Sequence, residues 1–494
     1  MTQNADDTAE PIDVLIVGAG ISGIGMAAHL AATCPDKRFS IIERRQRIGG
    51  TWDLFRYPGI RSDSDMSTLA YEFAPWKDEK VIAGGEDIRA YLDEVADSRG
   101  ISGRIRFGLS AIAADWDGKT ALWTLTVEDE AGRRNEIAAR FLFLGSGYYD
   151  YDRPHDADIP GLADFGGITV HPQFWPDVLD HAGKRVVVIG SGATAATLVP
   201  AMAETAAHVT LLQRTPSWYF TRPAADKLGA RLQRWLPGKL GYALTRWKNL
   251  HLQDYLVSKS RKEPGKMKAF LHRQIGEQLG SYDPADFTPP YDPWNQRMCL
   301  IPDGDLFAAI RSGKAAMATG RIAAVDRTGI KLEDGRHIAA EVIVTATGLR
   351  LATFGGMAIT VDGAPLNAAE HFYYRNCMLS NVPNFAAMFG YLNAAWTLRV
   401  DLVAGWICRL LKAMDARGAQ VATPTLPADH GLEEADPFAI LSSGYLRRGR
   451  HLIPKSAAAG PWRIGMHYFT DRKEMRAGPI DDGVMRLEKV PAAG

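Results

Sequence analysis

The sequence has little cysteine, no long apolar run and no excess of charge of either sign. Its four cysteines are scattered, with no C-x-x-C pair and no metal-ligand spacing: Cys34, Cys299, Cys377 and Cys408. This pattern argues against a disulfide framework, a zinc site or a dithiol redox centre, and it fits a reducing, cytoplasmic setting. Basic and acidic residues number 57 each, so the charge balance gives no reason to expect nucleic acid as a partner.

Two further absences concern membranes. No apolar run approaches the roughly 20 residues that a spanning helix needs. The first ten residues, MTQNADDTAE, lack the basic and apolar regions of an export signal. We therefore expect a soluble protein with no transmembrane segment, with peripheral membrane contact as an open alternative. At 494 residues the chain exceeds one compact core, which predicts two or three domains.

Two segments of the chain share one design. Each has an apolar strand, a glycine-rich turn, a helix and a second strand that ends in a charge: IDVLIVGAGISGIGMAAHLAATC with FSIIERR, and KRVVVIGSGATAATLVPAMAETA with HVTLLQRT. The apolar runs Val14–Val17 and Val186–Ile189 are typical of parallel strands covered on both faces. The repeat predicts an α/β fold with two dinucleotide-binding, Rossmann-like domains.

The first unit suits FAD or NAD, and with NADPH assigned to the second unit we predict that it binds FAD. In Gly18-x-Gly20-x-x-Gly23, the glycines allow a tight turn, close approach of a pyrophosphate and close packing of helix on strand. Glu43 ends the next strand, where a carboxylate accepts hydrogen bonds from ribose hydroxyls and repels a 2′-phosphate. The further residues predicted to bind this cofactor are Ser22, Gly50, Thr51, Trp52 and Asp63.

The second unit is the predicted NADPH site. Its turn is Gly190-x-Gly192-x-x-Ala195, and Arg214 stands where the first unit has Glu43. A guanidinium there pairs with a 2′-phosphate, although the residue type alone also suits a solvated surface position. Ser191, Thr194 and Thr215 complete this predicted set. Two nucleotide sites without a dithiol make molecular oxygen the next candidate acceptor of the electrons.

The coarse organisation predicts five segments. Residues 1–150 and 351–494 form the FAD-binding domain in two parts, and 151–220 and 297–350 form the NADP-binding domain in two parts. Residues 221–296 are expected to be a helical insertion with more Lys and Arg than acids. We expect this insertion to be a solvated helical cap, and docking to a membrane is the alternative.

Two motifs now carry a resemblance. Phe165-x-Gly167-x-x-x-His171-x-x-x-Trp175-Pro176 and Gly49-Gly50-x-Trp52, continued by Tyr57-Pro58-Gly59 and Asp63, match at every defined position the fingerprints of type I Baeyer–Villiger monooxygenases. The chain resembles this family almost from end to end. The segment around Asn393-Ala394-Ala395-Trp396-Thr397 is most similar to its ethionamide-activating branch.

The resemblance implies an activity. It implies that NADPH and O2 serve to insert oxygen next to a ketone carbonyl through a C4a-peroxyflavin, giving esters or lactones, with sulfoxidation as a side activity. Arg297 corresponds to the family's active-site arginine and Asp63 to the carboxylate that holds it, whereas His171 is expected to position domains. The alternatives are an N- or S-oxygenating flavin monooxygenase without ketone activity and a redox sensor that binds FAD and NADPH. The sequence does not identify the ketone or sulfide substrate or the oligomeric state.

Overall fold

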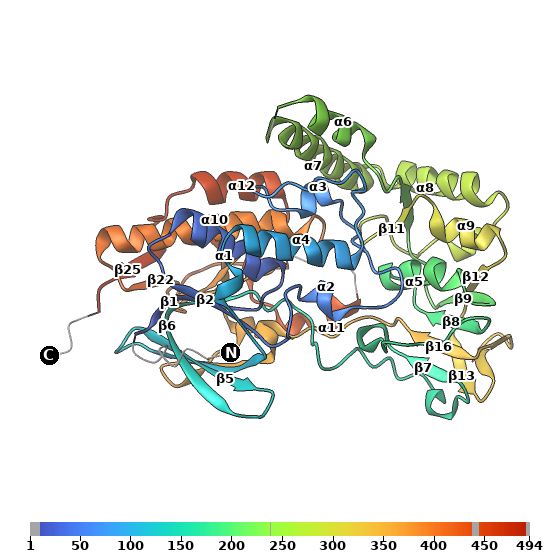
Figure 1. Cartoon of the computed structure of the whole chain (residues 1–494), viewed down its shortest axis with the longest axis horizontal. Helices are drawn as coiled ribbons and strands as arrows, with labels where there is room; N and C mark the ends of the chain where they lie inside the picture. Colours follow the sequence, from blue (N-terminus) through green and yellow to red (C-terminus); the bar gives the residue numbers. More distant parts are fainter. Residues whose placement is uncertain (1–9, 238, 437–443, 491–494) are drawn as a thin grey trace.

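The computed structural model describes residues 10–237, 239–436 and 444–490. Nearly all of the polar start of the chain, which argues against an export signal, therefore lies outside the described residues. A nine-stranded mixed sheet and a five-stranded parallel sheet lie side by side, each with helices packed against it (Figure 1). This arrangement confirms the predicted α/β fold with two Rossmann-like units.

The first sheet is built around strand β1 (Ile12–Val17). It runs parallel to β2 (Phe39–Glu43) on one side and to β6 (Arg134–Leu144) on the other. Val14, Leu15 and Ile16 are fully buried, as expected for a strand covered on both faces. The helix after the glycine turn is α1 (Ile21–Thr33). Further elements of the N-terminal part are α2 (Thr51–Leu54), α3 (Met66–Leu69), α4 (Gly85–Ser98), β3 (Ile105–Phe107), β4 (Leu109–Asp117) and β5 (Leu122–Asp129).

The second sheet has the order β12-β9-β8-β16-β7. Its strands are β7 (Ile168–Val170), β8 (Arg185–Ile189), β9 (His208–Gln213), β12 (Ala315–Thr319) and β16 (Val342–Thr345), all paired in parallel. Helix α5 (Ala193–Ala203) follows the second glycine turn, and α9 (Asp305–Arg311) packs against it. A small antiparallel sheet of β13 (Ile322–Asp326), β14 (Gly329–Leu332) and β15 (His337–Ala339) flanks this unit.

The C-terminal part of the chain returns to the first sheet. Strand β17 (Ala358–Val361) pairs with β4, and β21 (Phe385–Ala387) pairs with β6. Helix α10 (Trp396–Arg417) packs against α1. The remaining elements are β18 (Ala364–Pro365), β19 (Tyr373–Tyr374), β20 (Met378–Leu379), β22 (Val421–Pro424), β23 (Glu434–Ala435), α11 (Gly444–Arg448), β24 (Ser456–Ala457), α12 (Tyr468–Ala477) and β25 (Met485–Glu488).

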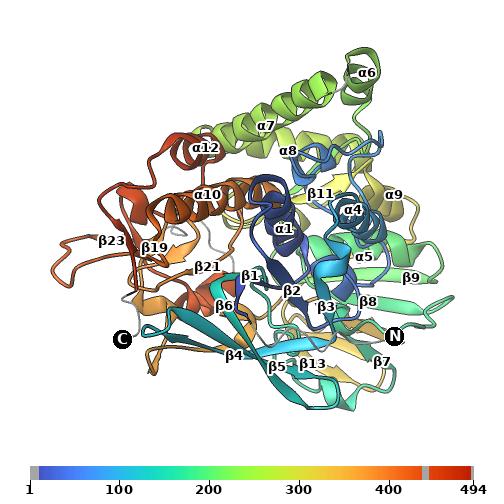
Figure 2. The same cartoon turned by 60° about the vertical axis from the view of Figure 1, so that its left-hand side comes forward.

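Helices form the segment between the two parts of the second unit. They are α6 (Lys227–Trp235), α7 (Lys239–Lys262) and α8 (Pro264–Leu279), and α6 and α7 project along the upper edge in Figures 1 and 2. Strands β10 (Tyr219–Arg222) and β11 (Cys299–Pro302) pair in parallel and join the two ends of this segment. Among the described residues, no helix is both long and apolar enough to cross a membrane.

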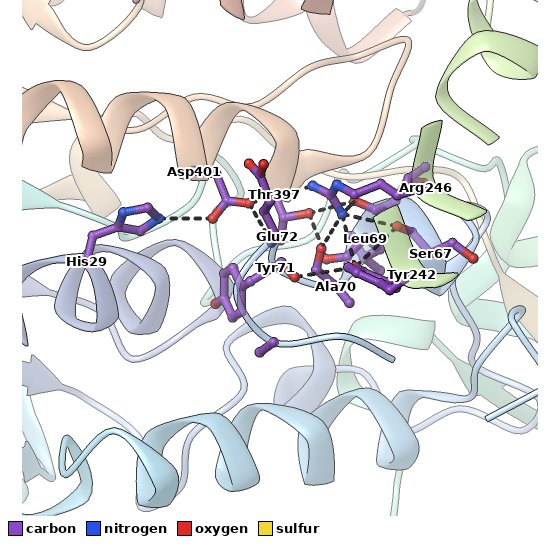
Figure 3. Close-up of polar contacts among 12 residues, drawn as sticks. His29, Ser67, Leu69, Ala70, Tyr71, Glu72, Tyr242, Arg246, Thr397 and Asp401 are labelled. Carbon is purple, nitrogen blue, oxygen red and sulfur yellow. Dashed lines mark hydrogen bonds and ion pairs between the residues drawn. The ribbon is translucent and has the colours of Figure 1, made fainter. Parts of the chain in front are cut away.

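A buried polar network fixes α7 to the first unit (Figure 3). The Arg246 guanidinium donates to the carbonyls of Ser67, Thr68 and Ala70 at 3.1, 3.3 and 2.8 Å. It also lies 3.6 Å from the carboxylate of Asp401 on α10. That carboxylate lies 3.1 Å from the ring of His29 on α1. Arg246 therefore connects α7 both to the segment around α3 and to α10. Asp401 extends this network from α10 to α1.

Candidate functional site

The first glycine turn is shaped by close backbone contacts. Gly18 has a φ of +99°, and a Cβ there would lie 2.9 Å from the carbonyl oxygen of Gly145. A Cβ at Gly23 would lie 1.8 Å from the carbonyl oxygen of Gly18. Side chains are therefore excluded at both positions, the first by conformation and contact and the second by the packing of α1 on β1.

A cavity of about 570 Å³ opens in front of this turn. The volume is within the range of small-molecule and cofactor sites. Eight of the residues predicted to bind FAD or act in catalysis line it together with Arg297: Gly18, Gly20, Ser22, Glu43, Gly50, Thr51, Trp52 and Asp63. Gly23 lies behind the wall. The structure thus brings the predicted set together from segments that are far apart in the sequence.

Two glycine turns form one wall of the cavity. The backbone N–H of Gly49 donates to the carbonyl of Ala19 at 3.1 Å. A Cβ at Gly20 would lie 3.5 Å from Cα of Gly50, so the two backbones are in near contact without side chains between them. This leaves a cradle of bare backbone that a side chain would fill, and it fits the pyrophosphate of a dinucleotide.

Glu43 is buried at the end of β2, where it faces the cavity. Its two carboxylate oxygens accept hydrogen bonds from the backbone N–H groups of Ala19 and Arg45, at 2.7 and 2.9 Å. Burial raises the pKa of Glu43, against the lowering effect of these hydrogen bonds. Each oxygen keeps a further lone pair for a ribose hydroxyl, so the side chain is held in place before any ligand binds.

Arg297 and Asp63 meet on the wall of the same cavity. Nη1 of Arg297 lies 3.5 Å from Oδ2 of Asp63, and Nε donates to the carbonyl of Leu392 at 2.8 Å. Both side chains keep accessible surface, 40% and 35%, and both line the cavity. Burial lowers the pKa of Arg297, but the carboxylate of Asp63 and the nearby tyrosines outweigh this effect. The pKa of Arg297 therefore lies above its ordinary value. The guanidinium is a fixed positive charge that faces the cavity.

Aromatic residues that the sequence did not assign surround this charge. Tyr148 and Tyr149 follow β6 and hydrogen-bond to each other, and burial raises the pKa of both. Tyr148 stacks on Trp396, with ring centroids 5.1 Å apart, and Trp396 donates to the hydroxyl of Ser22 at 2.8 Å. Tyr445 on α11 is close enough to Arg297 to affect its pKa. The only sequence signal for the first pair is its place after the glycine turn Gly145–Gly147.

The second glycine turn lies at the carboxyl end of β8. A Cβ at Gly190 would lie 2.3 Å from the carbonyl oxygen of Ala346, whereas Gly192 faces open space. The thiol of Cys299 donates to the carbonyl of Ser191 at 3.5 Å, which connects this turn to the strand that follows Arg297. Of the remaining predicted residues, Arg214 is exposed directly after β9, Thr215 is half-buried, and Thr194 pairs with the hydroxyl of Tyr57.

One of the two motifs that carry the resemblance lies where the units join. Gly50, Thr51 and Trp52 line the cavity, and a Cβ at Gly59 would lie 2.8 Å from Ala201 on α5. This motif therefore runs from the first cradle to the helix of the second.

The other motif forms the edge strand β7 and the turn after it. A Cβ at Gly167 would lie 2.3 Å from the carbonyl oxygen of Glu341, and Phe165 and Trp175 pack into the second unit. Nδ1 of His171 accepts from the backbone of Gln173 at 3.1 Å, and burial lowers the His171 pKa. The exposed Pro176 ends the motif. None of its five defining residues lines the cavity.

Comparisons with known proteins agree with this architecture. The family model for pyridine nucleotide-disulphide oxidoreductases matches residues 12–238. A steroid monooxygenase bound to NADP has the same fold, with a TM-score of 0.77 and 23% identity over 97% of this chain and 100% of that one. Cyclohexanone monooxygenase with bound ε-caprolactone gives a TM-score of 0.73 and 18% identity, over 97% of this chain and 100% of that one.

Relatives are similar along the whole chain. MymA of Mycobacterium tuberculosis is 46% identical, over 96% of this chain and 97% of that protein. AlmA of Acinetobacter baylyi is 45% identical, over 97% of this chain and 96% of that protein. EthA of Mycobacterium tuberculosis is 44% identical, over 98% of this chain and 99% of that protein. This protein therefore belongs to the family of FAD-containing monooxygenases that includes EthA, MymA and AlmA.

Proposed function

We propose that this enzyme uses NADPH and O2 to insert one oxygen atom next to a ketone carbonyl, giving an ester or a lactone. The observation that carries the proposal is the Arg297–Asp63 pair on the wall of the dinucleotide-sized cavity. A fixed cation beside the reacting atoms is needed for a reaction that builds negative charge on oxygen, and it has no evident use in a redox sensor.

Each predicted cradle has a defined task. The Gly18–Gly20 turn would hold the pyrophosphate of FAD while Glu43 accepts hydrogen bonds from its ribose. The Gly190–Gly192 turn would hold NADPH, and Arg214 would pair with its 2′-phosphate. When bound, the flavin supplies the redox chemistry that carries electrons from NADPH to O2. On this proposal, segments 1–150 and 351–494 serve FAD, 151–220 and 297–350 serve NADPH, and 221–296 is the helical insertion.

Arg297 would stabilise the negative charge that develops on the ketone oxygen as the carbonyl is attacked. Asp63 and the carbonyl of Leu392 orient the guanidinium, so that little reorganisation is needed during the reaction. The tyrosine hydroxyls near it are protonated at neutral pH, as any tyrosine is, and burial moves their pKa still further from neutrality. Because Tyr148 and Tyr149 hydrogen-bond to each other, only one of these two O–H groups can donate to an oxygen atom in the cavity.

The ligand of a structural neighbour supports this choice of reaction. Cyclohexanone monooxygenase is recorded with ε-caprolactone bound. That lactone differs from cyclohexanone by one oxygen atom inserted beside the carbonyl. The complete Phe165–Pro176 motif favours the same reaction class over N-oxygenation, because in the resemblance it separates the ketone-oxidising enzymes from their relatives.

The test is turnover of the purified, FAD-loaded enzyme with NADPH and ¹⁸O2 on a panel of linear, cyclic and aromatic ketones. We expect NADPH oxidation stimulated by ketone and an ester that carries one heavy oxygen atom. A thioether in the same assay measures sulfoxidation separately. If only thioethers or amines are oxygenated, the N- or S-oxygenating alternative is correct. If no compound stimulates NADPH oxidation, the sensor alternative gains support.

A further inference from the structure

The outer surface of α6 and α7 carries large apolar side chains. These helices lie along the upper edge of the molecule (Figures 1 and 2). Seven large apolar residues on them have exposed fractions between 39% and 77%: Leu228, Trp235, Leu240, Leu244, Trp247, Leu252 and Tyr255. Most of the exposed large apolar residues of the described chain thus belong to this one pair of helices, which is far from a random scatter.

The exposed residues of α7 form a continuous stripe. Leu240, Leu244, Trp247, His251 and Tyr255 recur at intervals of three or four, which places them on one side of the helix. The rings of Trp247 and His251 are in contact, with centroids 4.6 Å apart. This side has the pattern of a core-facing surface, yet apart from the stacking of His251 on Phe469 it faces solvent.

The other side of α7 already has its partners. Tyr242, Arg246 and Asn249 are buried, and Arg246 makes the network shown in Figure 3. The stripe is therefore not the face by which α7 packs on the rest of the chain, and turning the helix to bury it would break that network. The apolar side needs another explanation.

Cations flank the stripe. Between residues 227 and 262 there is one acidic residue, Asp254, and it pairs with His467. Six cations of the same helices are exposed and form no ion pair within the described part of the chain: Lys227, Arg231, Arg234, Lys239, Arg261 and Lys262. The whole chain has a formal net charge of zero, so this positive charge is concentrated locally.

We propose that α6 and α7 dock on the surface of an anionic lipid bilayer. Trp235 of α6 and the apolar residues of the α7 stripe, Leu240, Leu244, Trp247 and Tyr255, would lie at the boundary between headgroups and acyl chains, with the helices in the plane of the membrane. Tryptophan and tyrosine favour that boundary. The flanking lysines and arginines would contact lipid phosphates, and each would add to the attraction.

Charge favours a bilayer over a second copy of this chain. Two copies packed through the stripe would place the same unpaired cations, such as Arg231 and Arg234, around one interface. Like charges in that position oppose association. Anionic lipid supplies the opposite charge and an apolar phase together. This placement would also hold the cavity near the membrane, because Gln253 of α7 donates to the carbonyl of Asn393 at 3.0 Å and the next residue lines the cavity.

The experiment is flotation of the full-length, FAD-loaded enzyme with lipid vesicles. One set contains phosphatidylcholine alone, and the other contains phosphatidylcholine and phosphatidylglycerol in a ratio of three to one. We expect binding to the anionic vesicles that weakens as salt is raised, because surface charge attraction is screened. The double variant Trp235→Ser/Trp247→Ser should lower the vesicle partition coefficient by about ten-fold or more.

Matched variants separate the contributions. Arg231→Gln/Arg234→Gln should lose the preference for anionic lipid, whereas Phe107→Ser/Val178→Ser, which removes exposed apolar residues elsewhere, should bind like wild type. Flavin absorbance and melting temperature confirm that each variant is folded. If wild type does not float, or floats equally well with Trp235→Ser/Trp247→Ser, the proposal is wrong. A dimer in light scattering that this variant dissociates, without vesicle binding, would assign the surface to a second copy instead.

Discussion

The guanidinium of Arg297 lies 3.5 Å from the carboxylate of Asp63, although the two residues are 234 positions apart in the chain. Arg297 precedes β11, at the end of the helical segment, and Asp63 lies between α2 and α3 in the first unit. The pair thus connects two parts of the fold that are far apart in the sequence. Any movement of one part relative to the other changes the position of the charge in the cavity.

Replacing Arg297 with Ala should separate the two halves of catalysis. Flavin reduction by NADPH should survive, because both cradles remain intact. Oxygenation should fall by a factor on the order of 10²–10³, because a preorganised electrostatic stabiliser is lost. The measurement is anaerobic bleaching of the flavin, followed by product analysis in air.

Two further variants refine this test. Arg297→Lys should restore only part of the rate, since an ammonium lacks the planar fork that a carboxylate orients. Asp63→Asn should keep the cation but lower the rate of oxygenation, because the guanidinium loses its charged partner. Ester formation at the wild-type rate by Arg297→Ala would show that another group stabilises the developing charge.

Arg214→Ala tests the choice of nicotinamide cofactor. Arg214 is exposed at the end of β9, where a 2′-phosphate would be its partner. The KM for NADPH should rise by about one to two decades, since one charge-assisted contact is worth roughly 1.5–3 kcal/mol. The KM for NADH should change little. Equal losses with both cofactors in steady-state assays would remove Arg214 from the phosphate site.

Gly20→Val tests the FAD cradle. A Cβ at position 20 would lie 3.5 Å from Gly50, so the first carbon has room, but the branched side chain would occupy the path of the pyrophosphate. We expect a protein that purifies colourless or with little flavin. Val at Gly192, which faces open space, is the matched control and should leave FAD content unchanged while weakening NADPH binding. A fully yellow Gly20→Val protein would contradict the assignment.

Arg246→Met tests the network that holds α7. The guanidinium is buried and donates to three carbonyls beside α3. Its loss should lower the free energy of unfolding by roughly 3–5 kcal/mol, because it leaves buried acceptors and part of the Asp401 charge without a partner. Arg234→Met, at an exposed position on α6, should have little effect. Urea denaturation followed by far-UV circular dichroism gives both values, and equal stability would show that packing alone fixes α7.

The elements that the sequence predicted well are those with a local signal. The strands around Val14–Val17 and Val186–Ile189 are apolar without interruption, and each is followed by a glycine turn. These patterns act within a few residues and do not depend on the rest of the fold. The wall formed by Tyr148, Tyr445 and Trp396 was not predictable in this way. Its members come from three distant segments, and only tertiary packing brings them together.

The orientation of α7 shows a second limit. Its sequence has apolar residues on more than one side, and a helical period alone does not say which side faces the core. Buried Arg246 and exposed Trp247 are neighbours in the chain, the reverse of what their residue types favour. The carbonyls of Ser67 and Ala70 decide the matter, because they supply acceptors for the guanidinium that no local pattern reveals.

The parallel pairing of β10 with β11 holds the two ends of the helical segment together, so the segment is an insertion in the second unit. Tyr219 pairs with Cys299 and Arg222 with Pro302, so the chain leaves and re-enters the unit at adjacent points with the same direction. Added residues in a loop of this segment would cost the host only the slowly growing entropy of loop closure, about 0.6 kcal/mol for each doubling of loop length. The segment can therefore vary in its loops, whereas the Arg246 network and the packing of Ile275 in the second unit keep its helices, and with them Arg297 at its exit, in place.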